Sequence, residues 1–272
     1  MYDDALTAIF ADAAGKYKKG ATVQVCRDIP SDIDSIPKDN NHWLKIEDVL
    51  CVYLDMKDST RLSAAQQDKA TANAYQYFTD TAVRVLNHFE AVYIDVRGDG
   101  AFGLFNKNRF YHGMAAAITF LTFANNDLKR NAVINGKPLA CHIGADVKTV
   151  LVKRLGLRNV EGKTDKQNEV WAGKPVNMAA KLASHGGSNE FHISERVFNR
   201  IKAEKCEDLL LNCGCHNGEA TGIKSEAWTG IDVPENEQHI FDFSKYYRLK
   251  THGWCLSTHG ENALGAVCAH DK

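Results

Sequence analysis

The sequence predicts an α+β fold in which strand pairs alternate with helices. Three observations carry this expectation: apolar runs of strand length, Gly/Asp turns between neighbouring runs, and longer segments with helical spacing of apolar residues. Strand pairs interleaved with helices favour a mixed or antiparallel sheet with helices packed on it, as in ferredoxin-like domains.

The N-terminal region is predicted to precede this sheet. Residues 3–19 have the spacing of an amphipathic helix, and residues 28–41 form a loop rich in Pro, Asp and Ser. We therefore expect an N-terminal extension over 1–41, the main domain over 42–250, and a tail bearing Cys and His over 251–272.

The first strand of the main domain is predicted over 48–56 (DVLCVYLDM), where an apolar run ends in Asp55 and Met56. Such a run is typical of a buried strand that delivers a charge at its carboxyl end. We expect a helix to follow, as far as about Phe89. Three residues that can cap its start come soon after the strand: Asp58, Ser59 and Thr60.

The remaining elements continue the alternation. Strands over 91–96 and 101–105 are predicted to form a hairpin around Asp99, and residues 138–147 with 149–155 a second hairpin. The other expected elements are a helix over 109–129, a polar loop over 159–167, a helix over 176–184, a strand over 191–194, a helix over 195–203 and a strand pair within 237–250.

The composition excludes some functional classes. The formal net charge of the 272 residues is -1, so no basic field of the kind that binds nucleic acid is present. No apolar run approaches the roughly 20 residues that span a bilayer. The first apolar stretch, 5–14, follows two aspartates rather than the positive charge of a signal peptide. We expect a cytoplasmic protein that binds neither nucleic acid nor membrane.

The eight cysteines leave two interpretations open. Free thiols are the default in a reducing compartment, and Cys51 and Cys141 lie in apolar runs, where reduced cysteine behaves as a small hydrophobe. The alternative is a zinc site, although the C-x2-C spacing of common zinc modules is missing. Its candidate ligands are Cys206, Cys213, Cys215, His216, Cys255 and His259.

Two carboxylates stand out among the polar residues. Asp55 ends one strand and Asp99 lies in the next hairpin turn, so neighbouring strands would bring both to one edge of a sheet. Two carboxylates together with triphosphate oxygens suit hard divalent cations, and the Met56 carbonyl is a further candidate ligand. Backbone N–H groups at the start of the following helix favour phosphate oxygens. Taken alone, Asp99 is equally an ordinary turn residue and Asp58 an ordinary helix cap.

Four segments in order resemble the catalytic domain of class III nucleotidyl cyclases, the adenylate and guanylate cyclase family. The segments are Val49–Thr60, Arg97–Gly100, Ile143-Gly144 followed by Thr149–Arg158, and Gly173–Leu182. Each motif is weak singly, but the ordered set, over about 49–194, is specific.

The resemblance implies a head-to-tail homodimer with two shared sites. One protomer would supply Asp55 and Asp99 for two divalent ions, Mn2+ or Mg2+, and its partner Asn177 and Lys181. Asn177 would orient the ribose. Lys181, where the family usually has arginine, would neutralise charge on the α-phosphate. Arg158 stands where a triphosphate-binding arginine occurs. Outside this context, Asn177 and Lys181 are an ordinary solvated helix face.

The positions that read adenine in this family hold other residues here. Adenylate cyclases have lysine where this sequence has Asp95, and Asp or Thr where it has Val170. A carboxylate suits a base edge with N–H donors. Tyr53 and Trp171 would narrow the pocket towards a pyrimidine, although both are equally core aromatics and Asp95 equally a solvent-facing strand residue. The candidate substrate-binding residues are Tyr53, Asp58, Ser59, Thr60, Asp95, Arg97, Arg158, Val170 and Trp171.

A finer resemblance is to the pyrimidine cyclases of bacterial Pycsar antiphage defence, carried by Glu169–Asn177, Tyr246–Lys250 and Trp254-Cys255. It implies conversion of UTP, or next CTP, into the 3′,5′-cyclic nucleotide and pyrophosphate, and a separate effector that reads the product. Two alternatives stay open: a purine cyclase, and a catalytically silent nucleotide-binding sensor. The presence of Asp55, Asp99 and Asn177 argues against the sensor.

Overall fold

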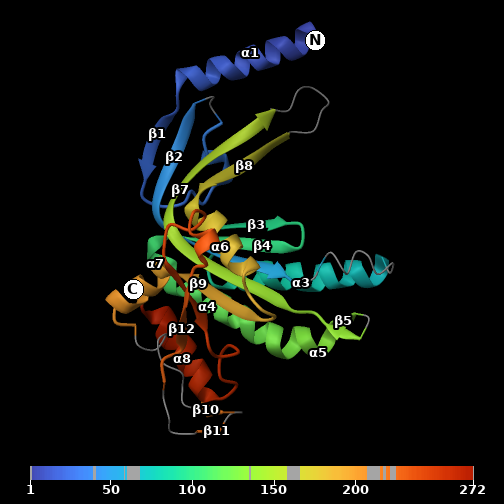
Figure 1. Cartoon of the computed structure of the whole chain (residues 1–272), viewed down its shortest axis with the longest axis vertical. Helices are drawn as coiled ribbons and strands as arrows, with labels where there is room; N and C mark the ends of the chain where they lie inside the picture. Colours follow the sequence, from blue (N-terminus) through green and yellow to red (C-terminus); the bar gives the residue numbers. More distant parts are fainter. Residues whose placement is uncertain are drawn as a thin grey trace. The chain divides into compact units, whose positions relative to one another are not determined.

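The computed structural model describes residues 2–38, 41–57, 59, 68–134, 136–157, 166–206, 215–216, 219–220 and 225–271. The chain divides into two compact units, of which the first contains 1–47 and 149–173 and the second 48–148 and 174–272. Two long strands, β2 (His42–Met56) and β7 (Cys141–Leu157), belong in part to each unit (Figure 1).

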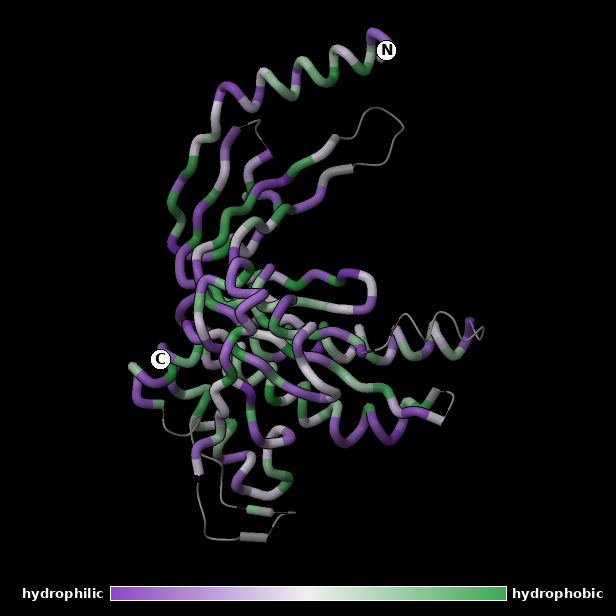
Figure 2. Tube along the Cα trace, in the orientation of Figure 1, coloured by the Kyte–Doolittle hydropathy of each residue, from purple (hydrophilic) through white to green (hydrophobic). Residues whose placement is uncertain are grey.

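The described part of the first unit contains one α-helix, a short 3-10 helix (Ile33–Ser35) and segments of four strands. Helix α1 (Asp4–Lys19) is the helix expected over 3–19, with Asp3 as its N-cap and Gly20 as its C-cap. It has no buried residue, and hydrophilic and hydrophobic residues alternate along it (Figure 2). Strand β1 (Thr22–Cys26) pairs in parallel with the start of β2. Strand β8 (Lys166–Gly173) pairs antiparallel with the end of β7.

The second unit is built on a mixed sheet of strand order β12-β13-β9-β7-β2-β4-β3. Its further strands are β3 (Tyr93–Arg97), β4 (Gly100–Phe105), β9 (Glu190–Ser194), β12 (Trp228–Asp232) and β13 (Lys245–Leu249). β7 and β9 run parallel, whereas the β12–β13, β13–β9, β2–β4 and β4–β3 pairs are antiparallel. The predicted α+β fold with a mixed sheet and packed helices is confirmed.

Helices cover both faces of this sheet. α3 (Asp68–His88), α4 (Phe110–Phe123) and α7 (Glu195–Ala203) contribute to the main core, which contains Leu54 from β2, Ile143 from β7 and Phe120 from α4. α6 (Lys174–Ser184) lies on the other face. A Cβ at Gly144 would collide with the backbone of α6, and Gly144 alternates with Ile143 along β7.

Two further helical segments follow these elements. α4 continues through a π-helical turn, Ala124–Leu128, to Asn131, so the expected helix over 109–129 is present. α8 (Thr258–Ala269) packs against α4 and buries Val267, although no helix was expected there. No helix within the described part of the chain is both long and apolar enough to cross a membrane.

Two expectations about the strands are wrong. Residues 138–147 and 149–155 do not form a hairpin, because β7 continues through Lys148 and Thr149. A tight hairpin needs residues that adopt positive φ, and neither residue favours it. The loop expected over 159–167 lies outside the described residues except for Lys166 and Gln167, which begin strand β8. Within 237–250 only β13 is a strand, and its partner β12 lies earlier in the chain.

Candidate active site

Three antiparallel strands of the second unit, with the turn between β3 and β4, carry predicted site residues, among them Tyr53, Asp55, Asp95 and Asp99. The register of β2, β4 and β3 places Tyr53, Phe102 and Asp95 in one row, and Asp55, Gly100 and Arg97 in the next. Residues directly opposite each other, and alternate residues along one strand, share a face of the sheet. The site residues therefore gather on one face, while Leu54 and Ala101, which are fully buried, point to the core.

The two aspartates lie at the same end of this strand group. Asp55 closes the pairing of β2 with β4, and the N–H of Met56 donates to the carbonyl of Asp99 over 3.3 Å. Burial raises the pKa of Asp55 from 3.8 to about 6, and the neighbouring charge of Asp99 adds to the rise. Among the described residues, no lysine or arginine forms an ion pair with either carboxylate.

Gly100 keeps the space beside Asp55 open. A Cβ at this position would stand 2.8 Å from Oδ1 of Asp55 and 3.1 Å from the hydroxyl of Tyr53, so any other residue would displace one of them. The adjoining Gly98 has φ of +64°, a left-handed conformation that suits glycine in the turn. Gly100 is therefore needed to leave room for Asp55 and Tyr53, whereas Gly98 is needed to adopt the left-handed conformation of the turn.

This donor set fits divalent metal. Among the described residues the two carboxylates have no cationic partner, and the pKa of Asp55 is raised, so they form a centre of negative charge. Hard cations prefer such oxygen ligands. Met56 is 2% exposed and its side chain belongs to the main core, so it would contribute only its backbone carbonyl. The open space that Gly100 leaves next to Asp55 is consistent with this use.

The predicted base residues are held by two different contacts. Nε of Arg97 donates to Oδ2 of Asp95 over 2.6 Å, and Nη2 forms an ion pair with the same oxygen over 2.6 Å. Asp95 is therefore not an isolated strand carboxylate. The ring of Tyr53 lies parallel to that of Phe102, with centroids 6.3 Å apart. Burial raises the pKa of Tyr53, and the charges of Asp55 and Asp99 raise it further.

The residues expected to complete the site stand on α6. Asn177 is exposed and Lys181 is half-buried. Within the part of the chain that the structure describes, no side-chain hydrogen bond or ion pair joins either of them to Asp55 or Asp99. Among the described residues of one chain, the pair on α6 (Asn177 and Lys181) is therefore not bonded to the pair of aspartates (Asp55 and Asp99).

Comparison with known proteins decides the family. No protein-family model matches the chain. A uridylate cyclase of Propioniciclava tarda is 32% identical over 252 residues, which are 90% of this chain and 74% of the relative. This chain belongs to the class III nucleotidyl cyclase family.

Two further comparisons agree with this identification. A uridylate cyclase of Micromonospora echinofusca is 28% identical over 245 residues, 89% of the present cyclase and 76% of the relative. The guanylate cyclase domain of RhGC from Catenaria anguillulae, solved in complex with GTP, has the same fold. Its TM-score is 0.56 at 14% identity, over 76% of this cyclase and 98% of that chain.

The structure does not test several other candidate residues of the cyclase. Asp58, Thr60 and Arg158 lie outside the described residues, while Ser59 is helical and half-buried. Val170 and Trp171 lie on β8 of the first unit, where Trp171 is 8% exposed and pairs with Val152. The metal and base group described above belongs wholly to the second unit.

Sequence reasoning missed an ion-pair network at the start of α6. Arg196 donates from Nε and Nη2 to the fully buried Asp146, over 3.1 and 2.6 Å. Asp242 accepts from Arg196 (2.5 Å), Lys148 (2.7 Å) and Lys174 (2.6 Å). Burial alone would raise the pKa of Asp242, but these three hydrogen bonds hold it well below its usual range. The network fixes the first residue of α6 to β7 and α7.

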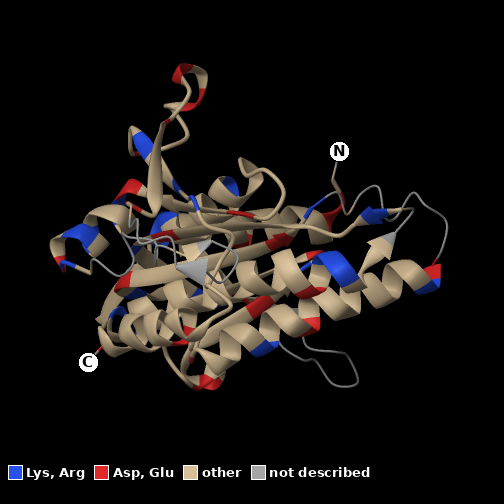
Figure 3. Cartoon of the chain, turned by 90° about the horizontal axis from the view of Figure 1, so that it is seen from below, with Lys and Arg blue, Asp and Glu red and all other residues tan. Residues whose placement is uncertain are grey.

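No local sequence signal could have found this network, because its members are separated by tens of residues. Elsewhere acidic and basic residues are interspersed along the elements, as Figure 3 shows. This mixture of acidic and basic residues agrees with the formal net charge of -1. The candidate active site therefore cannot be located from a concentration of charged residues alone.

Proposed function

We propose that this cyclase converts UTP into 3′,5′-cyclic UMP and pyrophosphate, with CTP as the next substrate. The observation that carries the proposal is the gathering of Asp55, Asp99, Asp95 and Tyr53 on neighbouring strands, with the aspartates at one end. The two curated relatives named uridylate cyclase support UTP as the substrate.

Two divalent ions, Mn2+ or Mg2+, would be held by Asp55, Asp99 and the carbonyl of Met56. When bound, they would activate the 3′-hydroxyl and offset charge on the leaving pyrophosphate. Asp55 must be deprotonated for this role, and its raised pKa makes that requirement measurable. Asp55 and Asp99 remain close because the Met56 N–H and the Asp99 carbonyl are hydrogen-bonded.

The other residues of the chain would bind and orient the nucleotide. Asn177 would hold the ribose so that the 3′-oxygen faces the α-phosphorus. A bond forms between these two atoms, and the bond from the α-phosphorus to the bridging oxygen of pyrophosphate breaks. Lys181 would neutralise the charge that develops on the α-phosphate. The triphosphate would be bound by Arg158 and by the helix start that contains Asp58, Ser59 and Thr60.

We expect the complete site to form between two protomers arranged head to tail. Asn177 and Lys181 of one protomer would face the metal aspartates of the other. An exposed Asn177 and a half-buried Lys181, without bonds to Asp55 or Asp99 among the described residues, leave their polar groups available for this contact. The dimer therefore predicts that two different inactive chains can share one working site.

Base selection would rest on Asp95, with Arg97 and Tyr53 beside it, while Val170 and Trp171 stay candidate base-binding residues from the sequence. Arg97 fixes one oxygen of Asp95, so the carboxylate has a defined orientation from which it could accept the N3–H of uracil. The Tyr53 ring, stacked near Phe102, would limit the length of the pocket. A purine cyclase remains the alternative, since a carboxylate would also accept from guanine.

We further propose that the product is a second messenger in antiphage defence, read by a separate effector in the cytoplasm. The resemblance to Pycsar cyclases supports this role. Cells carrying the cyclase with its native effector should resist phage, and cells carrying Asp55→Ala should not. Equal plating efficiency of phage on both strains would contradict the role in defence. It would not bear on the proposed cyclisation reaction.

The chemistry is tested by incubating the purified protein with UTP and Mn2+ and analysing the products by mass spectrometry. We expect cyclic UMP and pyrophosphate in equal amounts, and none from Asp55→Ala or Asp99→Ala. Turnover retained by either variant would contradict the metal assignment. Nucleotide binding without any turnover in the wild type would instead favour the catalytically silent sensor.

A further inference from the structure

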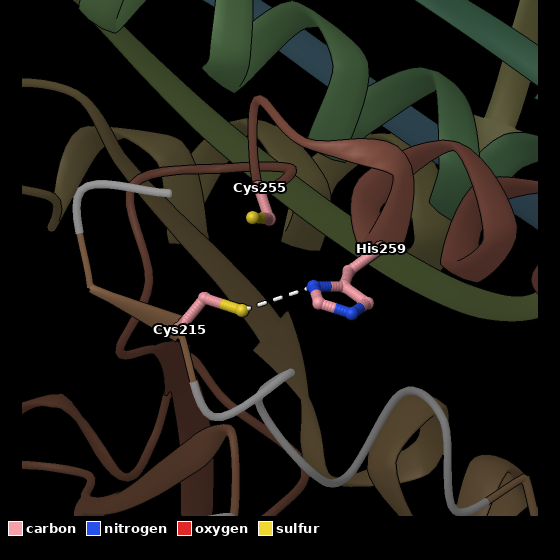
Figure 4. A group of neighbouring side chains, drawn as sticks. All are labelled: Cys215, Cys255 and His259. Atoms are coloured by element: carbon pink, nitrogen blue, oxygen red, sulfur yellow. Dashed lines mark hydrogen bonds between the residues drawn. The ribbon is translucent and has the colours of Figure 1, made fainter. Parts of the chain in front are cut away.

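Two cysteines and a histidine of the C-terminal part come together away from the candidate active site. Cys215 lies on β10 (Cys215–His216), Cys255 precedes α8, and His259 lies in the first turn of α8. Sγ of Cys215 is 3.1 Å from Nδ1 of His259, and the three potential ligand atoms lie within 4.8 Å of one another (Figure 4).

The backbone around α8 is shaped to hold Cys255 and His259 on the same side. A Cβ at Gly260 would collide with the carbonyl oxygen of Cys255, so only glycine lets the chain fold back this closely. Ser257 caps α8 by accepting the N–H of His259, and its Oγ is 3.0 Å from Sγ of Cys255. Cys255 and His259 are thus positioned by local structure, independently of Cys215.

We propose that Cys215, Cys255 and His259 bind a zinc ion. Zinc takes thiolate sulfur at about 2.3 Å and imidazole nitrogen at about 2.0–2.1 Å in tetrahedral geometry, which separates neighbouring ligand atoms by roughly 3.5 Å. The observed cluster needs only small side-chain movements to reach that arrangement. Two thiolates would balance the charge of Zn2+.

The zinc site would fasten the β10–β11 hairpin (Cys215–His216 with Glu219–Ala220) to α8. α8 and the segment before it are already fixed on α4. Trp254 donates from Nε1 to Thr119 over 2.8 Å, and Asp271 accepts the backbone N–H of Tyr111 over 2.9 Å. The metal would connect the hairpin to this fixed platform, so we assign it a structural role.

The test is the zinc content of the untagged full-length protein, purified with reductant and without chelator and measured by inductively coupled plasma mass spectrometry. We expect about one zinc per chain in the wild type. Cys215→Ser, Cys255→Ser and His259→Ala should each lower the content at least five-fold. Cys26→Ser, which changes a cysteine on β1, is the matched control and should keep the zinc. Asp55→Ala should also keep it, which separates this site from the metal aspartates.

A second measurement does not depend on whether the variants fold. In the wild type, alkylation of Cys215 and Cys255 should be slow and should accelerate at least ten-fold after a zinc chelator is added, while the rate at Cys26 stays the same. Wild-type protein without zinc, or zinc that survives Cys255→Ser, would overturn the proposal. So would a Cys215–Cys255 disulfide in the freshly purified, unreduced protein.

Discussion

The hydroxyl of Tyr53 and the carboxylate of Asp55 meet beside the same backbone position. Both side chains project from β2 on one face of the sheet, and a Cβ at Gly100 would stand 3.1 Å from the first and 2.8 Å from the second. The residue proposed to limit the base pocket and the residue proposed to hold metal are therefore neighbours, and the absence of a side chain at Gly100 keeps both in place.

Gly100→Ala tests this relationship. The added methyl group must displace Asp55 or Tyr53, because the third close neighbour is the backbone carbonyl of Leu54. We expect cyclase activity to fall at least ten-fold while the circular dichroism spectrum is unchanged. Gly265→Ala is the control, since a Cβ there meets nothing within 4 Å. Full activity of Gly100→Ala would contradict the described packing of Asp55.

The pKa of Asp55 predicts how metal binding depends on pH. Since the pKa is about 6, the carboxylate is ionised at pH 7.5 and largely protonated at pH 5. The rise in melting temperature that Mn2+ causes should be largest above pH 7 and should fall as the pH drops through 6. A Mn2+ effect that is constant between pH 7.5 and 5 would argue against Asp55 as a ligand.

The same pKa predicts the stability of the metal-free protein. The folded state binds a proton at Asp55 up to about pH 6, whereas the unfolded chain releases it near 3.8, so this group's stabilising contribution is lost as the pH rises between these values. Asp55→Asn should therefore melt roughly 2–4 °C higher than wild type at pH 7.5, about 1 kcal/mol after allowance for solvent screening. Asp232→Asn, with the side chain 82% exposed, should change little.

The buried pair of Asp146 and Arg196 predicts a large loss of stability. Arg196→Met would leave Asp146, which is fully buried, without its cationic partner. We expect the free energy of unfolding to fall by about 3–5 kcal/mol in denaturant titrations. The double variant Asp146→Asn/Arg196→Met should recover much of this loss, because no buried charge remains. If the double variant is less stable than Arg196→Met alone, the pairing is not the cause.

The shared site predicts complementation between inactive chains. Asp99→Ala and Asn177→Ala should each be inactive alone. Co-expressed, about half of the dimers are mixed, and each mixed dimer has one site with Asp99 and Asn177 both intact. Activity should therefore reach roughly a quarter of the wild-type value, measured as cyclic UMP per chain. A mixture as inactive as its parts would contradict sites shared between protomers.

The strands of the sheet and the two metal aspartates could be predicted from the sequence, because short-range residue patterns specify them. The apolar run that ends in Asp55 and the Gly-Asp-Gly turn at Asp99 predicted three strands and a turn that the structure contains. The continuity of β7 through Lys148 was not predicted, since two β-rich runs separated by one lysine look like a hairpin. The long-range pairing of Lys148 with Asp242 has no local signature.

Long-range contacts in the C-terminal part could not be predicted from local sequence patterns either. Sequence spacing alone argued against a common zinc module, because the C-x2-C pairs of such modules are missing. In the fold, Cys215 contacts His259 although 44 residues separate them. Only the fold brings these side chains together. The burial of Val267 and the contacts of Asp271 with α4 likewise depend on tertiary packing, which local propensity does not reveal.

The most direct test of the account is a competition among all four ribonucleoside triphosphates. The purified cyclase is given equal concentrations of ATP, GTP, CTP and UTP with Mn2+, and the initial rates of the four cyclic nucleotides are measured by mass spectrometry. We expect cyclic UMP to form at least ten times faster than either purine product, with cyclic CMP second. Cyclic AMP or cyclic GMP as the main product would contradict the assignment of Asp95 and Tyr53 to a pyrimidine pocket.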